Sequence, residues 1–255
     1  MFGGAGDDII EGGVNGNNRN VDMDGGEGDD IMFGSLYGND DMFGGDGNDF
    51  LNGRGGSDEI DGGKGDDILK AGTFSLQVGT DVLRGGEGND KLYGGFEAFD
   101  AIYGYGEFKY LYGDEGDDIM YGGLSATNEF QWGGAGNDFI FGGSGATRQI
   151  LNGNEGDDTI YPGTNLANGE MIANGGKGDD LINPWTLTYD AMDLVEQDPM
   201  TDYGNNSAYG YGQTLRGGEG KDKIWGPYLP MGDMLIEGGN GDDSLYGAYG
   251  SSGYG

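Results

Sequence analysis

Several residue types that commonly build functional sites are missing from this chain or scarce in it. None of its 255 residues is cysteine, which excludes disulfides and thiolate metal sites. Basic residues are scarce, since 12 lysines and arginines stand against 46 aspartates and glutamates. A protein that binds duplex nucleic acid needs a basic surface, so nucleic acid is excluded as a partner. No run of about eighteen apolar residues occurs, so we expect no membrane span, and the N-terminus does not resemble a signal peptide.

Glycine and acidic residues are what the chain has in abundance. Its 61 glycines and 5 prolines make up about a quarter of the sequence, and without a period that share would indicate disorder. The formal net charge of -34 points the same way, because a compact chain this acidic repels itself strongly. Either the chain is disordered or a cation neutralises it.

An internal repeat decides against disorder. A nine-residue unit of the form Gly-Gly-x-Gly-x-Asp-x-aliphatic-x occurs eleven times, and its eighth position is always Ile, Leu or Met. The units begin at Gly3, Gly25, Gly44, Gly62, Gly85, Gly113, Gly133, Gly153, Gly175, Gly217 and Gly238. The sixth position never varies, and it is Asp8, Asp30, Asp49, Asp67, Asp90, Asp118, Asp138, Asp158, Asp180, Asp222 and Asp243.

With this nonapeptide the chain resembles the repeats-in-toxin (RTX) family of calcium-binding β-rolls, and the resemblance covers most of its length. The resemblance implies export in one step, with the roll unfolded in low cytosolic calcium and folded outside the cell. We therefore expect an extracellular or cell-surface protein. Family members carry proteases, lipases and epimerases on domains outside the roll, so a catalytic domain can belong to a longer parent protein.

The unit also has a physical interpretation of its own. Glycines at positions one, two and four permit positive φ, so we expect the first six residues to turn sharply and point carbonyls inward. Asp114 and Asn154 replace the second glycine in two units, and both residue types tolerate the left-handed region. The last three residues are expected to form a short strand with position eight in the core.

The segments between units predict how each coil closes. Most of them carry an aliphatic residue two places before the next unit, as Met42 and Ile60 do. We infer an all-β parallel β-roll or β-solenoid with two half-turns per coil. The units make one edge, the regular edge, and the segments between them make the variable edge. Gln131 and Ala173 occupy the expected core place in two segments where the register is less clear.

The solenoid is predicted to span residues 1–246 as one domain, with a long insertion at 184–216 and a tail at 247–255 that is rich in Gly, Ser and Tyr. Met1 and Phe2 fit positions eight and nine of a preceding unit, so we expect the chain to continue a longer array.

Calcium is the expected neutraliser. A Ca²⁺ ion takes six to eight oxygen ligands, so one turn supplies about half a shell and the next turn supplies the rest. Eleven turns on the regular edge therefore predict about ten ions, each shared by consecutive aspartates of the invariant column. The variable edge presents Asp40, Asp58 and Asp81 at the equivalent place, which adds about two more ions and brings the total to about ten to twelve.

Later segments of the variable edge carry Lys109, Gln149, Met171 and Met234 at that place. Lys109 either replaces an ion with its own ammonium group or is solvated, and the second interpretation is favoured. About ten to twelve dications would reduce the formal charge from -34 to between about -14 and -10.

We expect no enzyme activity in this chain. Histidine is absent as well as cysteine, and no set of Asp, Glu, Ser, Lys or Tyr stands apart from the repeat pattern. Two other function classes remain. One is a calcium-triggered folding, secretion or spacer module of a larger secreted enzyme or toxin. The other is a structural protein of an extracellular assembly such as a surface layer, filament or adhesin.

The outward positions seven and nine of the units favour the structural class. Tyr121, Phe139, Phe141 and Tyr161 follow one another on consecutive turns, which predicts an outer aromatic face. Such a face suits self-association or packing against another part of the parent protein. The alternatives are scattered exposed apolar residues, which are ordinary, or an insertion loop that covers them.

Overall fold

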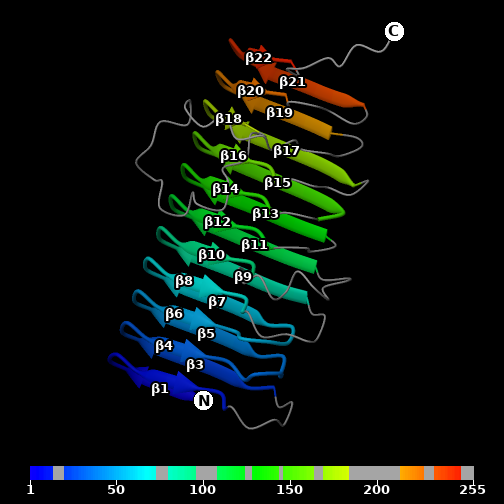
Figure 1. Ribbon diagram of the computed structural model, residues 1–255. Helices are drawn as coiled ribbons and strands as arrows, with labels where there is room; N and C mark the ends of the chain where they lie inside the picture. The colour runs from blue at the N-terminus through cyan, green and yellow to red at the C-terminus, as the bar shows by residue number, and fades with distance from the viewer. Residues whose placement is uncertain are drawn as a thin grey trace, which may run out of the picture.

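The computed structural model describes residues 1–13, 20–72, 80–95, 108–123, 128–143, 146–163, 169–183, 213–226 and 233–247. Throughout these residues the regular elements are β-strands, which stack coil upon coil from β1 to β22 (Figure 1). The strands belong to two parallel eleven-stranded sheets, and each strand pairs with the equivalent strand of the neighbouring coils. The all-β solenoid with two half-turns per coil is thus confirmed.

The odd-numbered strands form one sheet, called here the long-strand sheet. It contains β1 (Phe2–Ala5), β3 (Asp22–Glu27), β5 (Asp41–Asp46), β7 (Glu59–Lys64), β9 (Thr80–Glu87), β11 (Phe108–Glu115), β13 (Asn128–Ala135), β15 (Arg148–Glu155), β17 (Glu170–Lys177), β19 (Gln213–Glu219) and β21 (Met234–Asn240).

The even-numbered strands form the short-strand sheet. It contains β2 (Ile9–Glu11), β4 (Ile31–Phe33), β6 (Phe50–Asn52), β8 (Ile68–Lys70), β10 (Lys91–Tyr93), β12 (Ile119–Tyr121), β14 (Phe139–Phe141), β16 (Thr159–Tyr161), β18 (Leu181–Ile182), β20 (Lys223–Trp225) and β22 (Ser244–Tyr246). These strands coincide with positions seven to nine of the units, as the sequence predicts.

The core lies between the two sheets, and one column of residues from each sheet forms most of it. From the short-strand sheet it receives position eight of the units, for example Met32, Leu92 and Ile140, which are all fully buried. From the long-strand sheet it receives the residue two places before the unit, which is aliphatic in most coils, for example Met42 and Ile60. Gln131 and Ala173 lie in this second column, paired with Leu151 on either side, and both are buried, so the predicted register is confirmed there.

One prediction about the unit is wrong. Its first three residues do not turn but extend the strand of the long-strand sheet, as Gly25, Gly26 and Glu27 do at the end of β3. Only positions four to six cross to the other sheet. Positive φ occurs at positions two and four, for example 112° at Gly26 and 125° at Gly28, but not at position one.

The two substituted second positions behave as the sequence predicts, because Asp114 and Asn154 have φ of 76° and 85°. Most of the long insertion and of the tail lies outside the described residues, apart from 213–216 in β19 and Gly247.

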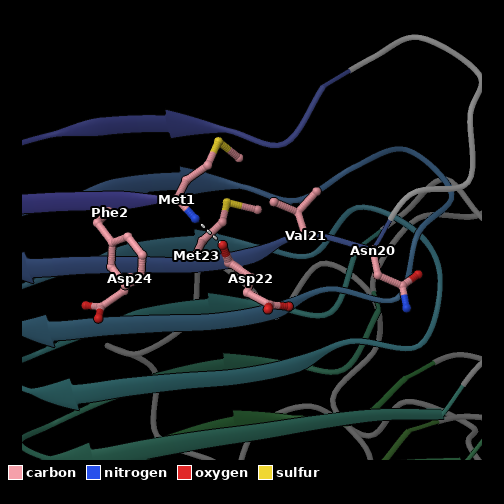
Figure 2. A pocket seen from close by; sticks show the side chains of 7 residues that line it. All are labelled: Met1, Phe2, Asn20, Val21, Asp22, Met23 and Asp24. Atoms are coloured by element: carbon pink, nitrogen blue, oxygen red, sulfur yellow. Dashed lines mark hydrogen bonds between the residues drawn. The ribbon is translucent and has the colours of Figure 1, made fainter.

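At the N-terminal end a small groove lies beside β1 and β3 (Figure 2). The Met1 ammonium group donates to the Asp22 carbonyl oxygen. The groove is lined by Met1, Phe2, Asn20, Val21, Asp22, Met23 and Asp24. Among the described residues, no helix is long and apolar enough to cross a membrane.

Candidate metal centre

The invariant aspartates form a single column along the regular edge. The Oδ1 atom of each one accepts a hydrogen bond from the backbone N–H of the aspartate one coil earlier, as Asp138 Oδ1 does from Asp118 N at 2.9 Å. Ten such bonds of 2.7 to 3.2 Å connect the eleven aspartates from Asp8 to Asp243. These bonds therefore fix the orientation of each carboxylate after Asp8 relative to the preceding coil.

The second carboxylate oxygen is left without a donor. Oδ2 is buried and has no hydrogen-bond partner in the first ten aspartates of the column, from Asp8 to Asp222. A methyl group on Gly133 would overlap Asp138 Oδ2 and would lie 2.6 Å from the carbonyl oxygen of Gly153 in the following coil. Two oxygen atoms from consecutive coils thus converge on the space that the absent side chain leaves. This close approach explains the glycine at position one, which needs no positive φ.

These positions suit a hard cation. A buried carboxylate oxygen that faces a carbonyl oxygen has no donor to satisfy it, and such an arrangement is costly unless a cation lies between the two. Within the described ranges no three acidic side chains gather as a metal cluster. An ion on this edge would therefore be held mostly by backbone carbonyls, with a carboxylate from the column, and oxygen ligands of this kind are the ones that Ca²⁺ prefers.

The variable edge repeats this arrangement for part of its length. Asp40 N donates to Asp58 Oδ1 and Asp58 N donates to Asp81 Oδ1, both at 2.9 Å. Oδ2 of Asp58 is buried without a partner beside Gly53, as on the regular edge. Oδ2 of Asp40 accepts from the backbone N–H of Ser35. The structure thus brings the three predicted residues into one column but gives each Oδ2 different surroundings.

Lys109 takes the next place in that column, where it pairs with Asp81 in the strand register. Its side chain is 9% exposed, and its ammonium group forms an ion pair with Asp81 Oδ2. The interpretation of Lys109 as a solvated lysine is therefore wrong. The alternative, an ammonium group that stands where an ion would otherwise lie, agrees with this contact.

The comparisons with known proteins agree with this geometry. A family profile described as the RTX calcium-binding nonapeptide repeat (4 copies) matches residues 1–17, 14–36, 35–69, 78–98, 99–126, 132–147, 149–164, 207–226 and 235–251. These segments cover well over half of the chain. The chain belongs to the RTX repeat family. RTX repeats bind Ca²⁺, and their β-roll is a structural calcium-binding module rather than a catalytic fold. None of the curated proteins matches the chain.

Burial raises the pKa of most carboxyl groups in the RTX column. The pKa reaches about 8 for Asp67 and Asp138 and about 7 for Asp118, and in each case desolvation is the largest cause. Neighbouring carboxylates raise the pKa further, while the backbone hydrogen bond to Oδ1 lowers it. A dication beside these groups would lower their pKa values again and keep the carboxyl groups charged.

A second ladder on the regular edge was not foreseen from the sequence. The exposed side chain at position five accepts a hydrogen bond from the backbone N–H at position five of the following coil, as Asp117 does from Asn137 at 2.7 Å. Asp and Asn alternate strictly in seven consecutive coils, Asp29, Asn48, Asp66, Asn89, Asp117, Asn137 and Asp157. Both residue types provide the acceptor, but alternation keeps neighbouring carboxylates two coils apart. The alternation itself was the signal in the sequence.

Beyond Lys109 the variable edge of the roll replaces ions with a buried polar network. Glu129 is fully buried and accepts hydrogen bonds from Gly143 N at 2.9 Å, from Gln149 Nε2 at 3.3 Å and from Gln131 Nε2. Gln149 in turn accepts from Gly163 N at 2.9 Å. Desolvation raises the pKa of Glu129 to about 7, against the lowering effect of these donors. Here N–H groups surround the carboxylate, so no cation is needed.

Proposed function

We propose that this protein is a calcium-dependent structural protein of an extracellular assembly, or a segment of one, in which ions along the regular edge hold the coils together. The observation that carries the proposal is the match between ten buried, unpartnered Oδ2 atoms and the ten spaces between eleven coils. Among the described coils, each of these ten aspartates has a following coil beside it, and Asp243 belongs to the last described coil. RTX repeat proteins are typically secreted, which agrees with a site that fills at extracellular calcium levels.

We assign as ligands the eleven aspartates of the regular column together with Asp40, Asp58 and Asp81 on the variable edge. The total remains about ten to twelve ions, because each space supplies carbonyls from two coils and a carboxylate from one or two. Bound ions would also reduce the self-repulsion of a chain with a formal charge of -34.

The structural role rests on the outer faces of the middle coils. On the short-strand sheet Tyr93, Tyr121, Phe141 and Tyr161 stack in consecutive coils, with ring centroids 5.1, 4.9 and 5.2 Å apart. These rings cover one another's faces, and Tyr161 is buried. Phe139 beside them is 46% exposed. The predicted aromatic face exists as a ladder of half-buried rings with one prominent exposed ring.

The long-strand sheet carries a second apolar strip that the sequence analysis missed. In one outward column Val82, Tyr110, Phe130, Ile150 and Ile172 follow one another in the strand register, each of them half-buried. The same column is acidic in the preceding coils, where it presents Asp22, Asp41 and Glu59. Both faces of the middle coils therefore carry an apolar strip, which favours packing against another surface over a freely solvated spacer.

Sedimentation velocity in millimolar calcium tests the structural role. The wild-type chain should assemble in calcium, and a Phe139→Ser/Phe141→Ser variant should assemble less. Ile31→Ser is the matched control, because Ile31 is an exposed apolar residue at position seven of the same sheet outside the ladder. A wild-type chain that stays monomeric at high concentration would contradict self-association and would favour the calcium-triggered folding or spacer module.

A further inference from the structure

On the variable edge, the spaces between consecutive coils that could hold an ion end at Lys109. At Asp40 and Asp58 the chain keeps a glycine at the start of the half-turn, and a methyl group on Gly34 or Gly53 would lie close to the carboxylate Oδ2. It would also lie close to the carbonyl oxygen that begins the following half-turn, 2.8 Å away in the case of Gly53. The space at Asp58 therefore has the same construction as those of the regular edge, whereas at Asp40 the Oδ2 atom also accepts a hydrogen bond from the Ser35 N–H.

The space above Asp81 departs from this construction in two independent ways. The residue that begins its half-turn is Ala71, which holds the same place as Gly34 and Gly53 because its N–H donates to the last residue of the next short strand. Ala71 is buried. Its methyl group therefore occupies the region that is equivalent to those into which Asp40 Oδ2 and Asp58 Oδ2 point beside Gly34 and Gly53. Asp81 keeps the ladder bond through Oδ1, but its Oδ2 meets the Lys109 ammonium group instead.

We propose that the Lys109 ammonium group is a built-in cation that takes the place of a calcium ion in the space above Asp81, and that this space is a latent calcium site. The inference rests on the proposed calcium binding of the other spaces. Lys109 supplies the positive charge that the Asp81 carboxylate requires, and Ala71 removes the room for an ion.

A tethered ammonium group differs from a bound calcium ion because it cannot dissociate from the chain. It stays in place whatever the calcium concentration, so the contact between β9 and β11 does not depend on calcium at this edge. The next coils continue in the same way, since Glu129 and Gln149 are satisfied by N–H donors. The middle of the variable edge is thus held by the chain's own groups, while the opposite edge of the same coils relies on ions.

Restoring the repeat chemistry should open the latent site. An Ala71→Gly/Lys109→Asp variant recreates the glycine and the aspartate of the other spaces, and it should bind one more calcium ion than the wild-type chain. Bound ions are counted by native mass spectrometry and by equilibrium dialysis. Lys177→Asp is the matched control, because it makes the same charge change at an exposed ion pair with Glu155 and should leave the count unchanged.

The possible outcomes separate the two proposals. An equal ion count in the double variant and the wild-type chain, with both folded in calcium, would overturn the latent site while leaving the proposed function intact. A wild-type chain that binds no calcium would overturn the proposed function and this inference together.

A second variant covers the case in which the double variant fails to fold. Lys109→Met keeps the length of the side chain but leaves Asp81 buried without a cation. We expect the calcium concentration at the folding midpoint to rise about tenfold in this variant, since the other ions must then stabilise the defect. Lys177→Met should not change that midpoint. A Lys109→Met chain with the wild-type midpoint would show that the ammonium group does not act as a cation there.

Discussion

The two edges of this solenoid compensate buried carboxylates with different chemistry. On both edges a buried carboxylate reaches from one coil toward the next. At Asp138 on the regular edge its free oxygen faces a carbonyl group, whereas at Glu129 on the variable edge it faces the N–H of Gly143. A carboxylate that faces acceptors needs a cation, and one that faces donors does not. The direction of the neighbouring backbone dipole therefore decides where a buried carboxylate of this protein needs a cation.

Removing calcium should have the largest effect on this comparison. We expect a chelator to unfold the chain cooperatively and millimolar calcium to restore it, because every space of the regular edge is then left with opposed oxygen atoms and a large net charge. Circular dichroism with and without chelator measures this. A chelated chain that keeps both its strand signal and its thermal midpoint would show that the regular edge stands without ions.

Single substitutions on the two edges should separate calcium affinity from stability. Asp138→Ala removes the column's carboxylate between two coils, and it should cost about 3 kcal/mol and raise the calcium midpoint of folding. Gln149→Ala breaks the buried network and should cost about 2 kcal/mol without changing calcium affinity. Calcium titrations followed by thermal unfolding compare the two. Equal shifts in the calcium midpoint would contradict the assignment of ions to the regular edge.

The pKa of Glu129 predicts how the variable edge responds to pH. An unfolded chain ionises this carboxyl group near 4.5, while burial raises the folded pKa to about 7. Between these values the folded state holds a proton that the unfolded state has lost, so stability falls as pH rises through this window and then levels off. The loss amounts to about 3 kcal/mol for this group.

A Glu129→Gln variant should lose this pH dependence, although it will be less stable at every pH because an amide group faces the same donors. Urea unfolding in saturating calcium between pH 4 and 8 measures the difference between the two chains. Saturating calcium keeps the aspartates of the column charged, so their titration cancels. A difference that stays constant across this range would contradict the assignment.

The position-five ladder predicts the smallest effect. Asn137→Asp places a carboxylate between Asp117 and Asp157, and the repulsion should cost less than about 1 kcal/mol and weaken with added salt. Asp179→Asn removes one partner of the only adjacent carboxylate pair, Asp157 and Asp179, in the stretch from Asp29 to Asp179. It should stabilise the chain by a similar amount. Identical thermal midpoints for both variants at low salt would show that the alternation has no electrostatic role.

Most of the fold followed from the nine-residue unit, because each position of the unit has a fixed place in the core, on a face or at an edge. The unit placed position eight in the core, and counting back two places from the next unit located Gln131 and Ala173 correctly. The unit did not show that its first two glycines extend a strand. Their spacing suits a turn, and only the backbone path distinguishes the positive φ of Gly26 from the close approach at Gly25.

Asp40, Asp58 and Asp81 form the column that the sequence predicts on the variable edge, but the surroundings of the carboxylates were predictable only on the regular edge. There each aspartate repeats the surroundings of the last, so one unit stands for all eleven. On the variable edge the outcome depends on side chains that reach across coils, such as Lys109 to Asp81 and Gln149 to Glu129. No local pattern encodes which long side chain meets which, because the loops between them differ in length. The strip from Val82 to Ile172 lies in the segments between the units, where no fixed repeat shows which residues align from coil to coil.

The most direct test of the calcium assignment is anomalous diffraction from crystals grown in calcium, collected at a wavelength where calcium scatters anomalously. We expect a row of about ten peaks along the regular edge, one beside each Oδ2 from Asp8 to Asp222. We expect no peak between Asp81 and Lys109. A folded, calcium-saturated crystal without that row of peaks would show that the regular edge does not bind calcium.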